Sequence, residues 1–526
     1  MNRQIEPRVF WPALIVILTL CFSAMARPED SAVVVNQARN WVSYNFGWLY
    51  LFSGIGCFAL LGWLTFGRFA SVKLGRADDE PEFSTFTWIA MLFCGGIGSS
   101  LTYWALLEPI YYLQTPPFAL ESGSSLSYEW AAMYGNFHWG LSAWAFWAVP
   151  AIVIGYSYYV RRQPRLTFSM ASKSVLGRHA TGPIGVAMDV AVMFGIIGGV
   201  GTSLGLGTPL IAAISAKILG IPQSVGLNLV ILFIWTLIFG TSVYLGLERG
   251  IARLSNINTY LALLLVAFVL VVGPTVFILN TFSNSMGLML DSFFRMSLWT
   301  DPIAEDGFPQ TWTVFYWAWW VAYAPMMGLF VARISRGRTF REVVFAMCFW
   351  GSVGCWAYFA VFGGYSLHLQ TTGVLDVTRL LTEVGPAETG AMILASLPMS
   401  GIVLPTIVVV LFIFMATTID SSAYILASVS TRELLADEEP ARWNRVLWAV
   451  ILGLTAMMML AIGGLEAIQA SSIVMALPVL LSLYVLVWAF VKDLLEDYGE
   501  ALAPPPLPVV EYEEGGRRLG DDSTRS

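Results

Sequence analysis

Long hydrophobic runs alternate with short polar segments along almost the whole chain of 526 residues. A helix needs about 20 apolar residues to cross the hydrocarbon core of a bilayer. Twelve segments of the chain meet that requirement, and polar residues are concentrated between them. The pattern therefore predicts twelve membrane-spanning helices, over residues 10–26, 45–67, 86–113, 131–160, 183–216, 223–245, 256–281, 310–332, 343–366, 401–430, 446–465 and 470–491.

The composition excludes several classes of protein. Hydrophobic residues make up 57% of the chain and charged residues 12%, whereas soluble domains carry about 25% charged residues. Because charged side chains cover the surfaces of soluble proteins, a soluble enzyme, a disulfide scaffold and a disordered protein are excluded. The net charge of −7 offers no basic face for nucleic acid. Five Cys without C-x-x-C spacing and three His do not favour a metal centre.

Positive charges divide unevenly between the two sides of these spans. With a cytoplasmic N-terminus, every one of the 28 Lys and Arg residues lies on the inside except Arg27, Arg39, Lys217, Arg295 and Arg379. This bias agrees with the positive-inside rule and predicts that both termini are cytoplasmic. The first span also resembles a secretory signal, so its cleavage stays open.

Two spans contain residues typical of interrupted helices. The third holds Gly95–Ser100, and the eighth holds Ala322–Gly328 around Pro325. Irregular backbone inside a membrane is tolerated where it lines a cavity, and the alternative is close packing of helices at small residues. Because each break opens a set of five spans, and five is odd, the arrangement predicts an inverted repeat of a secondary transporter.

Small residues also recur in the fifth span. Gly195 with Gly199, and Gly201 with Gly205, form G-x-x-x-G pairs. Such pairs allow helix backbones to approach closely. We expect close helix contacts here.

The domain organisation follows from these patterns. The aromatic-rich segment before the eighth span predicts a helix in the membrane interface, and the acidic, Pro-rich tail predicts a disordered end. The predicted units are the N-terminus with two extra helices (1–80), the first repeat (81–281), the external interfacial segment (282–309), the second repeat (310–492) and the acidic tail (493–526).

Aromatic residues are concentrated in the eighth span, which reads WTVFYWAWWVAY over residues 312–323. An interfacial belt fits Trp312 at the helix start, but Trp319, Trp320 and Tyr323 lie two to three turns deeper, where packing in a dry core is the alternative. Ring faces attract a quaternary ammonium or sulfonium group that has no N–H to satisfy, with about 0.5–2 kcal/mol per desolvated contact. The cluster therefore predicts a cage for an onium cation.

Deep polar residues are few. Glu108, Asp189 and Asp420 lie inside spans, with Glu466 near an end, and a carboxylate at such depth is a functional or helix-pairing candidate. Asp420 belongs to the oxygen-rich patch TTIDSS, residues 417–422. Its hydroxyl groups are suited to a hard cation such as Na⁺, and hydrogen bonds back to the helix are the alternative.

Four motifs resemble the betaine/carnitine/choline transporter family, and the resemblance covers residues 45–490. The most specific is WTVFYWAWWVAYAPMMGLFVARISRGRT, Trp312–Thr339. The others are GIGSSLTYWALLEP (96–109), FHWGLSAW (137–144) and TTIDSSA (417–423).

The resemblance implies an all-α polytopic membrane protein of twelve transmembrane helices with a LeuT-type five-plus-five inverted-repeat core. It implies a homotrimeric carrier in a bacterial inner membrane, without a cofactor, that moves glycine betaine, carnitine, choline or dimethylsulfoniopropionate. Neither an enzyme nor a channel fits, because the chain offers no nucleophile–base pair and no ring of pore ligands. The substrate residues that the resemblance implies are Trp319, Trp320, Tyr323, Trp139, Trp144 and Tyr111, with Trp312 at a peripheral site.

The resemblance leaves the coupling ion open. Na⁺-coupled members match this chain at Thr417 and Thr418, with backbone oxygens near Cys94, Ile97 and Phe414. Members that exchange substrates without Na⁺ carry a Met, here Met327, and an Arg that aligns with Asn258. The lost Arg favours Na⁺ coupling; exchange and proton coupling are the alternatives. The short acidic tail does not favour an osmotic sensor.

Overall fold

The structure is a computed structural model that describes residues 5–97, 100–245, 248–432, 434, 439–462 and 464–499, with side chains described outside 238–251 and 462–468. Within these residues the chain is almost entirely helical, with two isolated β-bridges, Ile5 to Thr431 and Lys73 to Thr339. Gly98 and Ser99 of the expected break, the Glu466 side chain and the tail from residue 500 lie outside the described residues.

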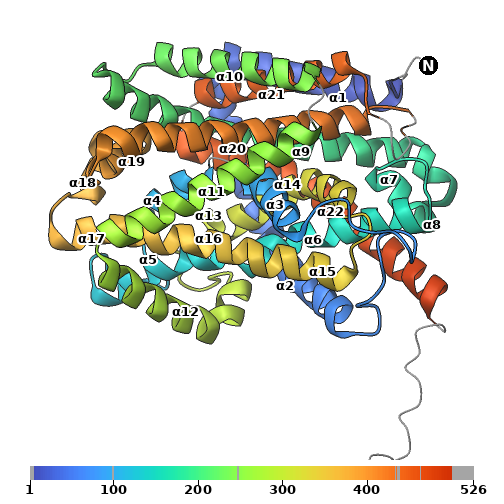
Figure 1. The fold of residues 1–526 in the computed structure, drawn as a ribbon, viewed down its shortest axis with the longest axis horizontal. Helices are drawn as coiled ribbons and strands as arrows, with labels where there is room; N and C mark the ends of the chain where they lie inside the picture. Colours follow the sequence, from blue (N-terminus) through green and yellow to red (C-terminus); the bar gives the residue numbers. More distant parts are fainter. Residues whose placement is uncertain are drawn as a thin grey trace, which may run out of the picture.

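The helices run mostly side by side in the view of Figure 1, with α10, α21 and α1 along one edge and α12 along the opposite edge. They are α1 (Pro7–Ala26), α2 (Pro28–Phe66), α3 (Thr85–Ile97), α4 (Ser100–Gln114), α5 (Ser125–His138), α6 (Leu141–Gly155), η1 (Tyr156–Val160), α7 (Phe168–Ala171), α8 (Lys173–Leu176), η2 (Gly177–Thr181), α9 (Pro183–Leu219), α10 (Val225–Leu245), α11 (Glu248–Val272), α12 (Thr275–Leu298), α13 (Phe308–Thr311), α14 (Thr313–Ile334), α15 (Phe340–Val344), η3 (Phe345–Gly351), α16 (Ser352–Tyr358), η4 (Phe359–Gly363), α17 (Gly364–Thr372), α18 (Val377–Glu383), α19 (Pro386–Ala395), α20 (Ser400–Val429), α21 (Arg442–Ile462) and α22 (Gly464–Tyr498).

The hydrophobic helices account for the expected spans. Within the described residues, ten are long and apolar enough to cross a membrane, and the bent pair of α3 and α4 makes an eleventh. The 21 residues of α10 form the remaining segment of the expected twelve. The prediction of an all-α polytopic membrane protein is confirmed.

The two sets of five spans pack in an exchanged pattern. In the first set, α9 is the third span, and it packs against α14 and α22, the first and fifth spans of the second set. Its counterpart α20 packs against α3 and α11, the first and fifth spans of the first set. The fourth spans follow the same rule, since α10 packs on α20 and α21 packs on α9. This reciprocal packing is that of a five-plus-five repeat.

One of the two expected breaks is present and the other is absent. The chain bends by 61° between α3 and α4, where the glycine run was expected to interrupt the third span. The expected break at Ala322–Gly328 is wrong, because α14 continues through Pro325 to Ile334. A β-carbon at Gly328 would stand 2.7 Å from Pro150 Cβ in α6. The small residue there serves close packing of α14 on α6, which was the alternative interpretation.

An interruption that the sequence pattern did not predict lies in the fourth span. Helix α5 ends at His138 and α6 begins at Leu141, so Trp139 and Gly140 join them. The Gly140 backbone lies close to the previous turn, and a β-carbon there would stand 2.5 Å from the Asn136 carbonyl oxygen. The interruption places Trp139 at a bend in the centre of the fold.

The glycines of α9 make the expected close helix contacts. A β-carbon at Gly195 would stand 2.6 Å from Val479 Cγ2 in α22, and one at Gly201 would stand 2.8 Å from Thr455 Cγ2 in α21. The seventh span ends earlier than expected, since α11 stops at Val272 and a separate helix, α12, begins at Thr275. The interfacial position of α12 stays a prediction.

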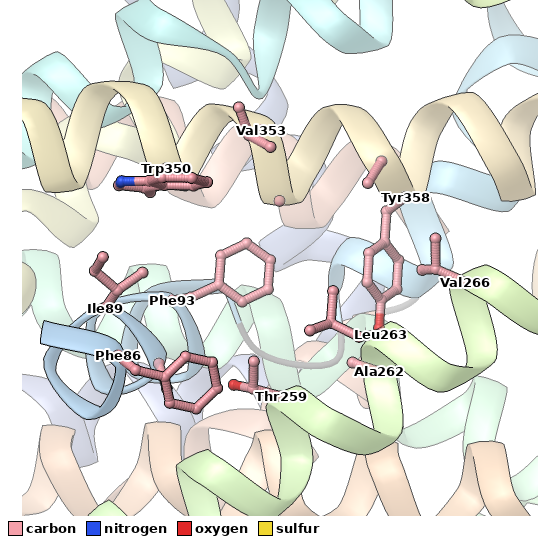
Figure 2. Close-up of a pocket in the computed structure, with 13 residues that line it drawn as sticks. Phe86, Ile89, Phe93, Thr259, Ala262, Leu263, Val266, Trp350, Val353 and Tyr358 are labelled. Atoms are coloured by element: carbon pink, nitrogen blue, oxygen red, sulfur yellow. The ribbon is translucent and has the colours of Figure 1, made fainter. Parts of the chain in front are cut away.

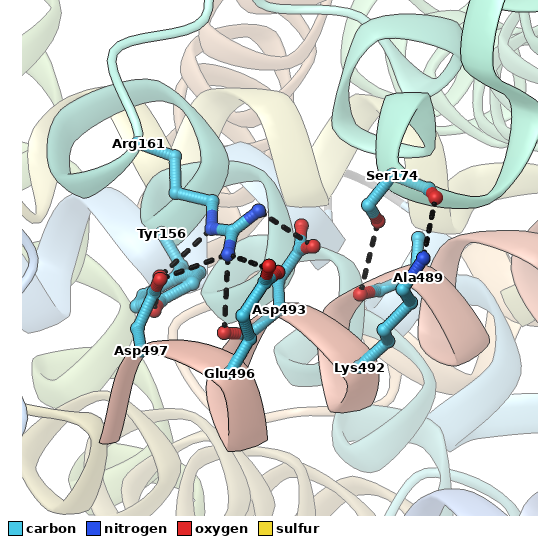
Figure 3. Close-up of polar contacts among 8 residues, drawn as sticks. All are labelled: Tyr156, Arg161, Ser174, Ala489, Lys492, Asp493, Glu496 and Asp497. Atoms are coloured by element: carbon cyan, nitrogen blue, oxygen red, sulfur yellow. Dashed lines mark hydrogen bonds and ion pairs between the residues drawn. The ribbon is translucent and has the colours of Figure 1, made fainter. Parts of the chain in front are cut away.

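A group of ion pairs joins the end of the fourth span to the end of the last one (Figure 3). The guanidinium of Arg161 donates from Nη1 to Asp493 Oδ1 at 2.7 Å, from Nη2 to Glu496 Oε2 at 2.9 Å and from Nε to Asp497 Oδ2 at 2.7 Å. The Tyr156 hydroxyl also donates to Asp497. These contacts tie η1 of the first repeat to α22 of the second.

Candidate functional site

The aromatic run of α14 lies in the interior of the bundle. Trp319 is 1% exposed, and Trp320 and Tyr323 are each 2% exposed. Tyr323 follows Trp320 by three residues and Trp319 by four, so it shares a side of the helix with both. That face meets α6 and α9, which pack directly against α14.

Three of the expected cage residues are in mutual contact. The ring of Trp139 meets Trp320 at a centroid distance of 4.8 Å and an interplanar angle of 75°, and meets Trp319 at 5.8 Å and 89°. Trp319 and Trp320 stack at 4.9 Å and 14°. These edge-to-face and stacked arrangements are those that aromatic quadrupoles prefer.

An aromatic wall is formed by Trp139, Trp147, Trp319, Trp320 and Tyr323. Of these, Trp147 was not among the expected site residues. Its ring contacts Trp320 at 5.2 Å and Tyr323 at 5.6 Å, and its Nε1 donates to the Trp320 carbonyl at 3.0 Å. Trp144, which the resemblance implied, lies one layer further away, against Trp147 at 5.1 Å and Phe93 at 6.3 Å. Both indoles lie on α6, so the rotation of this helix about its axis decides which of them faces α14.

The protein itself satisfies the indole N–H groups of this wall. Trp319 Nε1 donates to the Gly199 carbonyl at 3.1 Å, and Trp320 Nε1 donates to the His138 carbonyl at 2.9 Å. Trp139 Nε1 donates to Glu108 Oε2 at 2.9 Å. With these donors engaged, only the ring faces of the indoles remain to attract a ligand, and ring faces attract a cation that has no hydrogen to donate.

The expected peripheral residues form a second aromatic group. Trp312 contacts Tyr111 at 5.6 Å and Trp104 at 6.0 Å. Trp104 in turn contacts Trp319 at 6.4 Å, and Phe315 stacks on Trp319 at 5.7 Å. A continuous path of rings therefore joins the peripheral residues to the central wall.

Four of the five expected ion ligands are brought together between α3 and α20. Thr417 Oγ1 lies 3.3 Å from the Cys94 carbonyl and 2.9 Å from the Phe414 carbonyl, and Thr418 Oγ1 lies 3.5 Å from the same Cys94 oxygen. Ile97, one turn after Cys94, directs its carbonyl to Ser100 Oγ at 3.0 Å.

The oxygens of this group fit a hard cation. Thr417 Oγ1 has a third carbonyl neighbour, Ile413, at 3.1 Å. Three carbonyl oxygens therefore surround one hydroxyl that holds a single proton, and carbonyl and hydroxyl oxygens are ligands of hard cations. The hydrogen bonds back to the helix, which were the alternative interpretation, are also present.

The remaining candidates surround the same region. Met327 is fully buried and lies with Trp147 against Gly96, where a β-carbon would stand 2.7 Å from Met327 Cε. Asn258 is fully buried and lies beside the Cys94 thiol. Asp420 lies further along α20 and is 7% exposed.

An apolar crevice is lined by side chains of three neighbouring segments (Figure 2). It has a volume of about 320 Å³ between α3, α11 and the η3–α16 segment. Its inner wall includes Thr259, whose hydroxyl lies 3.5 Å from Cys94 Sγ, and Phe93, the neighbour of Cys94. The crevice is therefore lined by two neighbours of Cys94, whose carbonyl belongs to the oxygen group.

Glu108 is fully buried and belongs to a polar network that the sequence did not predict. Its Oε1 accepts from the Tyr112 hydroxyl, and its Oε2 accepts from the Tyr316 hydroxyl at 2.6 Å as well as from Trp139. His138 Nδ1 lies 2.6 Å from the Tyr112 hydroxyl oxygen. The partners come from α4, α5 and α14, so only the tertiary packing brings them together.

Comparison with known proteins gives two findings. A family model described as BCCT, betaine/carnitine/choline family transporter, matches residues 8–499. A solved structure titled "Substrate-bound outward-open state of a Na⁺-coupled sialic acid symporter reveals a novel Na⁺-site" is 12% identical to this chain. It aligns with 86% of this chain and 84% of its own, with a TM-score of 0.45.

Proposed function

The chain belongs to the betaine/carnitine/choline transporter family, and we propose that it takes up a small onium compound by alternating access between its two repeats. Its substrates are compounds with a trimethylammonium or dimethylsulfonium head: glycine betaine, carnitine, choline or dimethylsulfoniopropionate. The proposed setting is a bacterial inner membrane, with both termini in the cytoplasm.

The pairing of the indole donors carries this proposal. Trp139, Trp319 and Trp320 use their N–H groups on Glu108, Gly199 and His138, at 2.9 to 3.1 Å. A primary ammonium group would need hydrogen-bond acceptors, and burying it without them is costly. An onium head needs none, and each ring face contributes about 0.5–2 kcal/mol. The geometry therefore favours an onium substrate over other cations.

Na⁺ is the proposed co-substrate. The Cys94 carbonyl of α3 and the Thr417 and Thr418 hydroxyls of α20 would hold it between the two repeats. Inward movement of one positive charge across 100 mV supplies about 2.3 kcal/mol. A cation in this position would couple substrate uptake to closure of α3 on α20.

Exchange without Na⁺ is the second candidate function. Met327 packs against Gly96 at the end of α3. We expect a second cation, if one binds, to lie there, near the interruption between α3 and α4. A thioether is a weak ligand for a hard cation. If Met327 occupies that position in every state, uptake would depend on internal substrate instead of Na⁺.

Reconstituted protein tests both candidates. Uptake of labelled glycine betaine, carnitine, choline and dimethylsulfoniopropionate would be measured with and without a Na⁺ gradient. Accumulation only with the gradient supports symport, and uptake that needs internal substrate supports exchange. Trp320→Ala should abolish binding. Trp488→Ala removes a side chain of α22 that is 65% exposed, and it should leave binding unchanged. Equal uptake by both variants would contradict the cage.

A further inference from the structure

Glu108 is a buried carboxyl group whose basic neighbour is His138, with Nδ1 lying 3.5 Å from Glu108 Oε1. It is fully buried, and three donors approach it, the Tyr112 and Tyr316 hydroxyls and Trp139 Nε1. Within the described residues no Lys or Arg pairs with it, and an isolated charge at this depth is costly. Taking up one proton would remove that cost.

The Tyr112 hydroxyl connects this carboxyl group to His138. It donates to Glu108 Oε1 and lies 2.6 Å from His138 Nδ1. On the other side of the ring, His138 Nε2 lies 3.0 Å from Thr313 Oγ1. A hydroxyl and a neutral imidazole can each donate and accept. The four groups therefore form an unbroken chain of hydrogen bonds that begins at the first residue of α14.

The chain of hydrogen bonds from Thr313 to Glu108 can hold its protons in two arrangements. In the ionised arrangement, His138 Nδ1–H donates to Tyr112, Tyr112 donates to the Glu108 carboxylate, and His138 Nε2 accepts from Thr313. If a proton arrives at Nε2, the Nδ1 proton moves to the Tyr112 oxygen and the Tyr112 proton moves to Glu108 Oε1. Tyr112 and His138 are neutral again, and one O–H bond on Glu108 accounts for the added proton.

The same groups touch the aromatic wall. Tyr316, which donates to Glu108, stacks on Trp320 at 5.7 Å and 28°. Trp139 donates to Glu108 and packs on Trp320, and the His138 carbonyl accepts from Trp320 Nε1. The carboxyl group therefore lies one ring behind the wall, where its charge acts on a cation that faces Trp320.

We propose that Glu108, Tyr112 and His138 form a proton-binding site, and that its proton competes with the onium head of the substrate. The competition rests on the proposed function, because it assumes an onium cation against Trp320. An ionised Glu108 attracts that cation through the wall, and the bound cation disfavours protonation of Glu108. At an effective dielectric constant of about 20, a unit charge about 10 Å away changes binding by roughly tenfold.

Among the described residues, no other charged group competes for this role. The titratable side chains that face the site are His138 and Tyr134 from α5, Tyr316 from α14, and Tyr103 on α4 itself. Arg295 and Asp306 act on Tyr134, further out. Among the described residues, α9, η4, α16, α17, α18 and α19 also pack on α4, and they present no charged side chain that influences Glu108.

Infrared spectroscopy tests the proton site without any substrate. Difference spectra of the full-length protein between about pH 5 and about pH 9 cover the pH range in which a buried carboxyl group gains or loses its proton. We expect a protonated-carboxyl band that Glu108→Gln removes and that the matched control Asp189→Asn retains. Tyr112→Phe keeps the Glu108 carboxyl group but removes the hydroxyl that joins it to His138. In this variant the carboxyl band and the imidazole bands of His138 should no longer change together. A spectrum with no Glu108-dependent change would overturn the site.

Substrate affinity tests the competition. Glycine betaine, whose charge is constant over this range, should bind the wild type roughly tenfold more weakly at the acidic end. Glu108→Gln should bind weakly at both ends. Equal pH dependence in both proteins would overturn the competition. If Trp320→Ala binds like the wild type, the cage itself fails, and the infrared result still decides the proton site because it uses no substrate.

Discussion

The ring of Tyr323 lies so close to the backbone of Gly199 that a β-carbon built at position 199 would stand 2.8 Å from Tyr323 Cδ2. The Gly199 carbonyl also accepts a hydrogen bond from Trp319 Nε1 at 3.1 Å. One residue of α9 therefore positions two aromatic side chains of α14. A close approach of this kind requires a residue without a side chain.

Gly199→Ala should weaken substrate binding by about tenfold, because overpacking a tight contact costs about 1–3 kcal/mol and here displaces Tyr323. Isothermal titration of glycine betaine would measure the change. Gly287→Ala is the matched control, since a β-carbon at Gly287 in α12 meets nothing within 4 Å. If the two variants bind alike, Gly199 does not position the wall.

Thr417→Val should raise the Na⁺ concentration for half-maximal uptake by about tenfold, because it removes a hydroxyl worth about 1–3 kcal/mol when it is buried and engaged. The valine keeps the shape and loses the oxygen that lies 3.3 Å from the Cys94 carbonyl. Thr406→Val, at a half-buried position of α20, removes a hydroxyl that donates to the Ile402 carbonyl, and it should change nothing. An unchanged Na⁺ dependence in Thr417→Val would remove this residue from the ion site.

Gly354→Ala should disturb the same site from behind. A β-carbon at Gly354 would stand 2.3 Å from Phe93 Cε2, so Phe93 must shift, and with it the neighbouring Cys94 carbonyl. We expect the Na⁺ concentration for half-maximal uptake to rise by about fivefold or more, in line with the cost of overpacking. Gly62→Ala, which meets nothing within 4 Å, is the control. Wild-type Na⁺ dependence in Gly354→Ala would show that α3 tolerates the shift.

The sequence predicts the spans well because bilayer thickness sets the length of each hydrophobic run. It also identifies Trp319 and Trp320, whose depth in α14 follows from counting turns. It does not show that Trp147, and not Trp144, faces α14, because both lie on α6 and the rotation of that helix about its axis depends on tertiary packing. The contacts of Glu108 with Tyr316 and His138 join three helices, and no spacing along the chain indicates them. The close contact between Gly328 of α14 and Pro150 of α6 is equally nonlocal.

Asp79 should make stability depend on pH. The Arg336 guanidinium donates to its two oxygens at 3.1 and 3.2 Å, and this contact, with the Arg76 amide, lowers the pKa of Asp79. Because the pKa is lower in the folded state, the contribution to stability is present above the unfolded pKa of about 3.9 and is lost as the pH falls through the folded value.

Melting curves of Asp79→Asn and the wild type should therefore differ at neutral pH and converge below about pH 4. Asp78→Asn, which alters the exposed neighbour, should melt like the wild type throughout. A gap between Asp79→Asn and the wild type that persists in acid would mean that the carboxylate charge is not the cause.

Arg161 should hold the predicted cytoplasmic side closed. Its side chain is 22% exposed and contacts Asp493, Glu496 and Asp497 near the end of α22. Arg161→Gln keeps two donors but loses the charge and the fork that spans three carboxylates. We expect a lower melting temperature, equivalent to about 2 kcal/mol. Arg379→Gln, which breaks an exposed pair at 68% and 51% exposure, should cost much less, as exposed ion pairs do.

Loss of this contact should also open a path beside α22. Ser174 lies next to the same helix end, where Lys492 Nζ donates to its carbonyl at 2.9 Å (Figure 3). A cysteine introduced by Ser174→Cys should react faster with an impermeant maleimide when Arg161→Gln is also present, because η1 and α22 are then free to separate. The native cysteines are buried and provide the background. A lower melting temperature without faster labelling would mean that Arg161 stabilises the fold but does not govern opening.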